Sequence, residues 1–425
     1  MRRALLIALF FIPMAAHAAA FDPETATNAY LATLNGAARA KSDAYFEGGY
    51  WLTLWGTLVA ILSDGLLLHF GLSRRFRDWA ERVTKRRWLQ PALYTLPYIL
   101  VGTLITLPWT IYAQFVREKQ YDLMNQTLGD WSFDQAKDLG IDLVILPLIF
   151  AAIFVALRRF PRSWWLWATG GSVLFSALAA LIAPVFLAPL FNTYTELKPG
   201  PVRDRVEAMA TSRHIPAEHI YVFDASKQTK RVSANVSGLG PTIRISLNDN
   251  LLNRTTLPEQ AAVMGHEMGH YVLGHVYKSI LYFSLIFLAG FWSLYRLTPM
   301  IIARYGTRWG VRGMDDPAAI PIYAILFSLF FLLLTPVTSS IIRTSESEAD
   351  AFGLDVAREP DGFAKVSLAL SEYRKIDPGP IEEILFYDHP SGHTRIRMAM
   401  DWKAAHLAEV EARDPALSLK NSAPK

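Results

Sequence analysis

Residues 263–271 read Val-Met-Gly-His-Glu-Met-Gly-His-Tyr and contain the pattern His-Glu-x-x-His. On a helix, residues four apart lie on one face, so His266 and His270 direct two imidazoles to one point. Imidazole nitrogens at this spacing are typical ligands of a tetrahedral zinc ion. Glu267 lies beside the pair, where a carboxylate can take a proton from metal-bound water. The alternative is a chance pair of helical histidines, which the three fixed positions of the pattern disfavour.

A catalytic zinc ion also needs a third protein ligand and one position open to water. The acidic stretch at residues 345–350 offers candidates, because Glu346 and Asp350 are four apart and share a helix face. We predict Glu346 as the third ligand and Asp350 as the carboxylate that orients a metal-bound histidine. Glu348 is expected to point away from this face. The alternative is an ordinary solvated acidic face at the start of a helix.

A further polar group lies at residues 388–395, Asp-His-Pro-Ser-Gly-His-Thr-Arg. Hydroxide attack on a peptide carbonyl creates an oxyanion, which a cation or hydrogen-bond donor must stabilise. His389 and Arg395 are candidates for that role, and an ordinary loop followed by a basic helix start is an equally good reading of the residues alone. Three other histidines are expected to be structural or surface residues: His214, His219 and His275.

Composition indicates a membrane protein. The chain has 425 residues, of which 52% are hydrophobic, and its mean hydropathy is +0.20. This apolar share exceeds that of soluble domains. The net charge is only +4 and no basic run interleaves with aromatic residues, so nucleic acid is a poor candidate partner. The absence of cysteine excludes disulfides, thiolate metal ligands and a cysteine nucleophile.

Six apolar segments have about the length that spans a bilayer, although the third is marginal. They cover residues 50–72, 91–115, 143–157, 164–190, 276–302 and 318–342. Asp64 and His69 lie within the first segment, where they either face a water-filled interior or serve helix packing. Residues 1–20 combine two arginines, a short apolar stretch and Ala-His-Ala. That pattern predicts a cleaved signal peptide, with an uncleaved first membrane helix as the alternative.

Loop charge predicts the orientation. Basic residues number fourteen in the loops at 73–90, 158–163 and 296–317, against five in the alternating loops at 21–49 and 115–140. The first set should therefore be cytoplasmic. The region 191–275 and the C-terminal part then face the other side, which is the periplasm in a bacterial inner membrane.

The polar region before the histidine motif predicts a small α+β unit. Residues 203–212 are helix-like, and residues 219–223 are typical of a short buried strand. Residues 231–236 and 242–247 are predicted to form a hairpin around a Gly-Pro turn. Thr256 and Glu259 predict a capping box for the motif helix, which is expected to run to about His275 and continue into the next membrane segment.

These observations divide the chain into five parts. They are a signal peptide or first membrane helix at 1–20, N-terminal membrane helices at 21–190, a catalytic α+β segment at 191–275, membrane helices at 276–342, and a C-terminal catalytic segment and tail at 343–425. The predicted fold class is an all-α polytopic membrane protein of six to seven transmembrane helices around a hydrated chamber, with a small α+β catalytic patch.

Together the motifs resemble those of the type I CAAX prenyl proteases, integral membrane zinc metallopeptidases of the gluzincin type. The resemblance rests on the His266-Glu267-x-x-His270 pattern, on Glu346-x-x-x-Asp350, and on His389-Pro390 followed by Arg395. It covers nearly the whole chain, from about residue 37 to residue 399.

The resemblance implies seven membrane helices around a hydrated chamber and one zinc ion per chain. It implies His266, His270 and Glu346 as ligands and Glu267 as general base, with His389 and Arg395 near the scissile carbonyl. It also implies that the strand of Ala234, Asn235 and Val236 pairs its backbone with an extended substrate peptide. The family's usual Asn-Ala dipeptide is reversed here, which leaves the role of the Asn235 side chain open.

We therefore predict an integral membrane zinc metalloendopeptidase that hydrolyses peptide or protein substrates associated with the membrane. The family's eukaryotic members face the cytosol, whereas loop charge places this site away from it, so CAAX-box processing is implied by resemblance only. Two alternatives are a non-catalytic membrane scaffold or channel with a structural zinc, and an intramembrane site-2-type protease. The natural substrate, the cleavage preference and the oligomeric state do not follow from the sequence.

Overall fold

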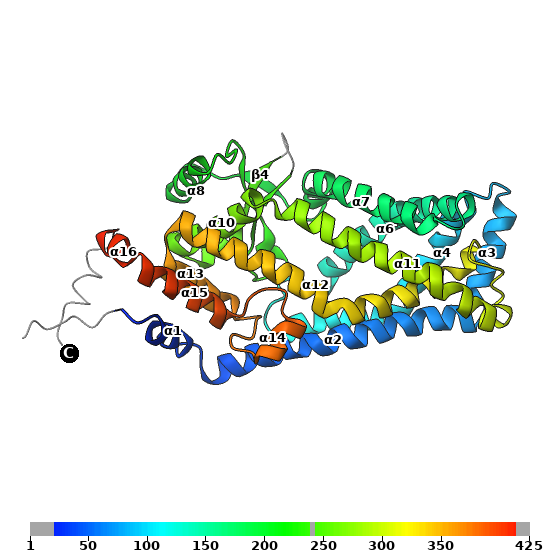
Figure 1. Ribbon diagram of the computed structural model, residues 1–425, viewed down its shortest axis with the longest axis horizontal. Helices are drawn as coiled ribbons and strands as arrows, with labels where there is room; N and C mark the ends of the chain where they lie inside the picture. The colour runs from blue at the N-terminus through cyan, green and yellow to red at the C-terminus, as the bar shows by residue number, and fades with distance from the viewer. Residues whose placement is uncertain (1–20, 239–242, 414–425) are drawn as a thin grey trace, which may run out of the picture.

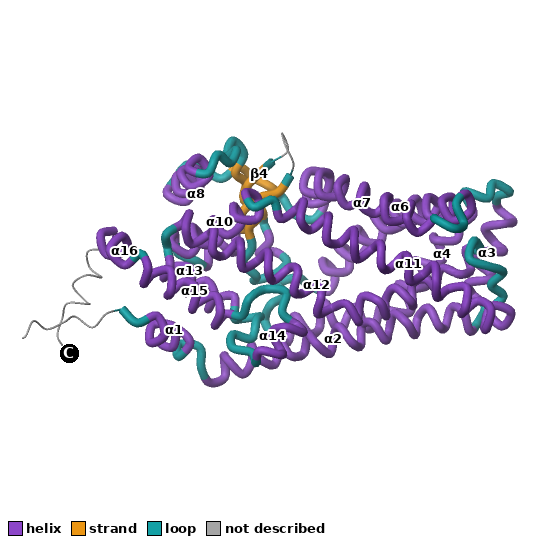
Figure 2. The backbone as a smooth tube through the Cα atoms, in the orientation of Figure 1, coloured by secondary structure: helices purple, strands orange, loops and turns teal. Residues whose placement is uncertain are grey.

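The computed structural model describes residues 21–238 and 243–413 and shows an elongated, mostly helical protein (Figures 1 and 2). Six helical segments in this part of the chain are long and apolar enough to cross a membrane. Their main helices are α2 (Gly36–His69), α4 (Gln90–Ile111), α6 (Leu128–Arg159), α7 (Trp164–Ile182), α11 (His275–Trp309) and α12 (Ile320–Ala357). The six predicted segments are thus confirmed by length and composition. The third is not marginal, because α6 extends over 32 residues.

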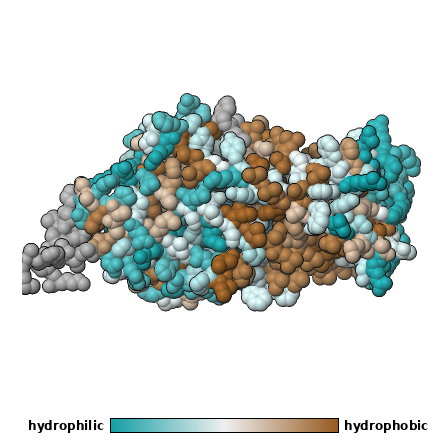
Figure 3. All heavy atoms as spheres, viewed as in Figure 1, coloured by the Kyte–Doolittle hydropathy of each residue, from teal (hydrophilic) through white to brown (hydrophobic). Residues whose placement is uncertain are grey.

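A broad apolar band crosses the long helices, and hydrophilic surface lies at both ends of the molecule (Figure 3). Large apolar side chains in this band are exposed, among them Leu62, Leu104, Leu148 and Leu333. Such a surface is unfavourable in water but is matched by lipid tails. The arrangement is that of an integral membrane protein, and the predicted fold class is confirmed.

Asp64 lies buried within α2 and accepts a hydrogen bond of 2.9 Å from the Tyr98 hydroxyl on α4. This contact agrees with the helix-packing alternative for Asp64. His69, at the end of α2, is exposed and lies against the ring of Phe70.

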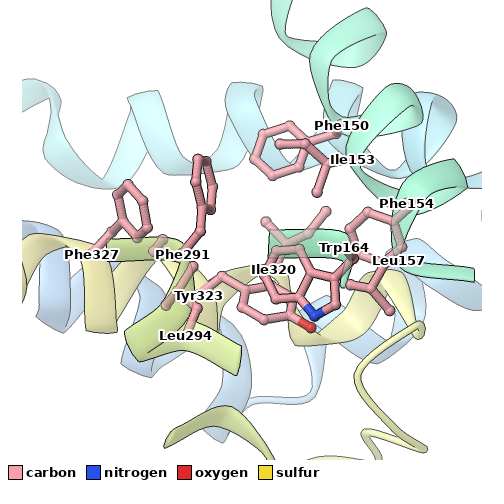
Figure 4. A pocket seen from close by; sticks show the side chains of 11 residues that line it. Phe150, Ile153, Phe154, Leu157, Trp164, Phe291, Leu294, Ile320, Tyr323 and Phe327 are labelled. Carbon is pink, nitrogen blue, oxygen red and sulfur yellow. The ribbon is translucent and has the colours of Figure 1, made fainter. Parts of the chain in front are cut away.

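An apolar cavity of about 230 Å³ lies between α6, α7, α11 and α12. Figure 4 shows its aromatic lining, which includes Phe154, Trp164, Phe291 and Tyr323. None of the side chains that line it is a metal ligand, a carboxylate or a histidine, so this space holds no groups for hydrolysis.

Four short strands form a sheet beside the membrane helices. They are β1 (Tyr194–Glu196), β2 (Ile220–Phe223), β3 (Ala234–Ser237) and β4 (Arg244–Asn248), in the spatial order β1-β2-β4-β3. β4 pairs with β2 in parallel and with β3 in antiparallel register, with Ala234 opposite Leu247. The predicted strands and hairpin pairing are confirmed, and residues 239–241 of the turn lie outside the described residues. β3 is an edge strand of this sheet.

Three helices accompany the sheet: α8 (Pro201–Ser212), α9 (Asp249–Arg254) and α10 (Leu257–Val272). Buried apolar side chains join them to the strands, among them Val206, Ile245, Leu247, Met264 and Met268. α10 carries the histidine motif, and its N-terminus has the predicted capping box, in which Glu259 Oε2 accepts from Thr256 N at 2.6 Å. The sheet and α8 thus hold one face of the motif helix.

The motif helix does not continue into the next membrane segment. α10 ends at Val272, and α11 begins at His275. Gly274 between them has φ +65°, a left-handed conformation that favours glycine and ends a helix. The expectation of one continuous helix is therefore wrong, and the break changes the position of His275.

The C-terminal part contains α13 (Pro360–Leu370), α14 (Pro380–Phe386), α15 (Gly392–Ala405) and α16 (Leu407–Arg413). Of these helices, α13 packs against the motif helix, α14 packs against α12, and α15 packs against α13. The N-terminal helix α1 (Pro23–Leu31) lies against α15. The predictions for residues 1–20, including a signal peptide or seventh membrane helix, and for the tail at 421–425 lie outside the described residues.

Candidate active site

Helices α10 and α12 meet with almost no side chain between them. A Cβ atom on Gly265 would lie 2.8 Å from the Gly353 carbonyl oxygen, and one on Gly353 would lie 2.7 Å from His266 N. A Cβ atom on Gly269 would lie 3.0 Å from the Ala349 backbone. Glycines at these positions let the two backbones touch. This contact brings the acidic stretch of α12 against the histidines of α10.

Three side chains converge there. His266 Nε2 lies 3.2 Å from Glu346 Oε2, His270 Nε2 lies 3.4 Å from Glu346 Oε1, and the two Nε2 atoms are 3.1 Å apart. Atoms bound about 2.0–2.1 Å from a tetrahedral zinc ion are about 3.3 Å from one another. The three predicted ligands are therefore spaced as the corners of one coordination shell.

The position of the proton on the His266 ring also indicates a metal site. His266 Nδ1 lies 2.7 Å from Asp350 Oδ1, so the proton of the neutral ring belongs on Nδ1 and the lone pair on Nε2. That lone pair faces the Glu346 carboxylate, whose Oε2 is buried and has no hydrogen-bond partner among the described residues. Lone pairs that face one another in a buried site repel unless a cation lies between them. The donor set therefore fits a metal ion.

Asp350 is completely buried, and its carboxylate is held from a second side. Arg395 on α15 donates from Nε to Asp350 Oδ2 at 2.9 Å and from Nη2 to Asp350 Oδ1 at 2.5 Å. Such a two-pronged pair fixes the carboxylate in one orientation. Arg395, Asp350 and His266 therefore form a chain that sets the direction of the first imidazole.

Glu267 lines a cavity of about 190 Å³ with His266, His389 and Arg395. Burial raises the pKa of the Glu267 carboxyl, and the neighbouring histidines oppose this shift. A carboxylate whose proton affinity is raised in this way suits proton transfer near neutral pH. The cavity therefore brings Glu267 and His389 into one space beside His266.

His389 approaches this group from the loop between α14 and α15. Its Nε2 lies 3.2 Å from Glu346 Oε2, and its Nδ1 lies 2.8 Å from Asp388 Oδ1. The structure thus places both predicted oxyanion residues at the cavity, but the two nitrogens of Arg395 that bind Asp350 are already engaged. The role of His389 and Arg395 toward a substrate carbonyl stays a prediction.

Comparison with known proteins agrees with this geometry. Residues 24–193 match the CAAX prenyl protease N-terminal region of five membrane helices, and residues 196–403 match peptidase family M48. An uncharacterized metalloprotease of Bacillus subtilis, YhfN, is 31% identical over 79% of this chain and 79% of its own length. This chain belongs to peptidase family M48. It is an integral membrane metalloprotease, and His266, His270 and Glu346 form a group that could hold a metal ion.

Two eukaryotic relatives and one solved structure extend the M48 likeness. The CAAX prenyl protease 1 homolog of Arabidopsis thaliana is 29% identical over 84% of this chain and 86% of its own length. CAAX prenyl protease 1 of Saccharomyces cerevisiae is 28% identical over 71% and 70%. The crystal structure of S. mikatae Ste24p superposes with a TM-score of 0.71 at 21% identity, covering 89% of this chain and 94% of that one. That structure shows that the fold is shared.

The second histidine of this M48 peptidase is held by His275, which was predicted only as a structural or surface residue. His270 Nδ1 lies 2.8 Å from His275 Nδ1, and His275 Nε2 lies 3.0 Å from Glu348 Oε2. Glu348 also accepts from Lys278 Nζ at 2.6 Å. On a continuous helix, residues five apart point about 140° away from each other. The break at Gly274 instead turns His275 back over His270.

Replacing His275 with alanine should weaken metal binding about 10- to 100-fold, because the outer partner of a ligating imidazole sets its orientation and basicity. Competition with a fluorescent zinc chelator measures the dissociation constant directly. The exposed His219 provides the matched control, as its replacement by alanine removes an imidazole outside the site. An unchanged zinc affinity in the His275 variant would show that this contact does not support the ligand.

The start of the edge strand β3 lies at the catalytic cavity. Ala234 and the two residues before the strand, Val232 and Ser233, line the cavity with Glu267, whereas Asn235 pairs with Ser246 and is not among the lining residues. Because β4 occupies only one side of β3, the other edge keeps backbone groups for an extended chain. The predicted substrate role of Ala234, Asn235 and Val236 stays a prediction.

Proposed function

We propose that this M48 peptidase is a zinc metalloendopeptidase with one zinc ion per chain, bound by His266, His270 and Glu346. The observation that carries the proposal is the buried meeting of three lone-pair donors at coordination spacing, next to a cavity that contains Glu267. Zinc in such a site polarises a water molecule and the substrate carbonyl.

The chain's own residues would carry the proton transfers. Glu267 takes a proton from the attacking water and gives it to the leaving amine. His389 and Arg395 are proposed to stabilise the negative charge on the carbonyl oxygen. Asp350 orients the imidazole of His266, and His275 orients that of His270, during these proton transfers. A structural zinc site in a scaffold would have four protein ligands, and Glu267 would then have no role.

The proposed substrate is a peptide that reaches the site in extended form along β3. A chain that adds to the free edge gains backbone hydrogen bonds whatever its sequence. A cleft of about 720 Å³ leads away from the catalytic cavity between residues 231–233, which precede β3, and residues of α2 and α12, so the substrate would approach from the membrane side. Two relatives are named CAAX prenyl protease 1 or its homolog, and cleavage near the C-terminus of a substrate protein is therefore included in this proposal.

We place the protein in a bacterial inner membrane with the catalytic side toward the periplasm. The basic loops lie at the hydrophilic end that carries α3 (Leu72–Val83), remote from α10 (Figure 1). By the charge rule this end is cytoplasmic. Reporters fused after Arg87 and after Arg254 should report opposite compartments, with the Arg87 fusion in the cytoplasm. The reverse result would place the catalytic side in the cytoplasm.

Removal of the metal should abolish activity. The purified protein should cleave an unfolded test protein, lose this cleavage completely on treatment with a strong chelator, and regain it when zinc is returned, because hydrolysis requires the activated water. Magnesium provides the control, since it prefers all-oxygen, octahedral sites and cannot replace zinc at two imidazoles. Cleavage that persists in the chelated protein would contradict the proposal.

A further inference from the structure

Arg374 is a cation beside the active site that forms no ion pair with any residue described by the structure. It lies in the loop after α13 and is half-buried, and no hydrogen bond or ion pair reaches its guanidinium from residues 21–238 or 243–413. Neighbouring arginines differ. Arg231 donates to Glu118 Oε2 at 2.8 Å, and Arg395 is bound by Asp350. A charge partly removed from water without a partner costs free energy, so such a group indicates a missing ligand.

The position of Arg374 joins two spaces. It lines the catalytic cavity with Glu267 and His389, and it also lines the cleft that runs toward α2 and α12. Val232, Ser233 and Tyr373 line both spaces too. A peptide lying along residues 232–234 from the cavity into the cleft would therefore pass Arg374.

The local charges leave Arg374 available for an anion. The nearby carboxylate of Asp388 is engaged by His389 at 2.8 Å. Glu346 faces the two metal-binding histidines. Burial lowers the pKa of Arg374, and the charges of Tyr373, Asp388 and Glu346 oppose this shift without forming a hydrogen bond or ion pair with the guanidinium. A planar guanidinium binds a carboxylate through two parallel hydrogen bonds, a geometry that favours this anion over others of similar size.

We propose that Arg374 forms a carboxylate-binding subsite that selects peptides with a carboxylate a few residues from the bond to be cleaved. The carboxylate belongs either to the substrate's C-terminus or to an acidic side chain. The inference rests on the proposed peptidase function and adds a specificity residue to it. Arg374 would bind substrate directly, so it acts on substrate affinity rather than on proton transfer.

Binding is measured first, in a Glu267→Gln background that is expected to keep the metal and to cleave at least about a hundredfold more slowly than the wild type. The probes are three forms of one fluorescent peptide that the wild-type protein cleaves near its C-terminus: a free carboxylate, a C-terminal amide, and an amide with glutamate as the last residue. The first form, the third, or both should bind about tenfold or more tightly than the plain amide. Which of the two is preferred identifies the source of the carboxylate.

Replacement of Arg374 by glutamine should remove this preference, so that all three peptides bind as the plain amide does. Arg374→Lys should keep part of it, since lysine retains the charge without the two-pronged geometry. Arg254→Gln is the matched control. Arg254 pairs with Glu372 outside both spaces, so its loss removes the same charge nearby and should leave the preference unchanged.

The outcomes separate the two levels of the proposal. No preference in the parent protein, a preference that survives Arg374→Gln, or an equal loss for all three peptides overturns the carboxylate subsite. The last result would show that Arg374 acts on the site as a whole. Failure of the wild-type protein to cleave any of a broad set of unfolded peptides would instead overturn the peptidase function. If no peptide is cleaved, the same three C-terminal forms of an uncleaved peptide still measure binding at Arg374.

Discussion

Replacing Glu267 with glutamine should lower kcat for peptide cleavage by about 10²- to 10⁴-fold, the usual contribution of a general base. Glutamine has nearly the same shape as glutamate but cannot accept the proton of the attacking water. Glu267 lies in the catalytic cavity and is not one of the three converging ligands. Zinc content should therefore stay at the wild-type level.

The measurement is single-turnover cleavage of a fluorogenic peptide, with zinc content determined on the same sample. A thermal unfolding curve shows whether the variant is folded. Wild-type cleavage in a folded, zinc-loaded variant would show that another group takes the proton. Loss of both zinc and activity would mean that Glu267 holds the site together instead of acting in it.

Replacing Gly353 with alanine should inactivate the enzyme although Gly353 touches no substrate. The added Cβ would lie 2.7 Å from His266 N, against backbone that cannot rotate away, so α12 must move relative to α10. Displacement of about 1 Å in a catalytic site costs about 10²-fold in rate, and forced overpacking costs about 1–3 kcal/mol of stability. We therefore expect at least a hundredfold loss of activity and weaker zinc binding.

The matched control is Gly170→Ala in α7, where an added Cβ meets no atom within 4 Å. This variant should keep full activity and zinc affinity. Peptidase assays measure the activity of both variants, and chelator competition measures their zinc affinity. Equal, wild-type behaviour of the two would show that the close approach of α10 and α12 is not what places Glu346.

The meeting of His266, His270 and Glu346 could be predicted from sequence because each part has a local signature. His266 and His270 lie one helical turn apart, and so do Glu346 and Asp350, so each pair shares a face whatever the tertiary structure. The capping residues Thr256 and Glu259 likewise report the start of the helix locally.

Features that depend on how two elements meet could not be predicted in this way. The role of His275 follows from the helix break at Gly274, which local spacing assigned to a continuous helix. Gly265, Gly269 and Gly353 carry no chemical signal, because their function is visible only when the facing backbone is known. Arg374 is one arginine among many until the three-dimensional structure shows that no described residue pairs with its guanidinium.

The central claim is that one carboxylate from α12 completes a metal site begun by two histidines of α10. Zinc content per chain, measured by elemental analysis of purified wild type, Glu346→Ala and the exposed control Glu409→Ala, tests it directly. The account predicts one zinc per chain in the wild type and the control, and almost none in Glu346→Ala after mild dialysis. Full zinc retention at wild-type affinity in Glu346→Ala would contradict it.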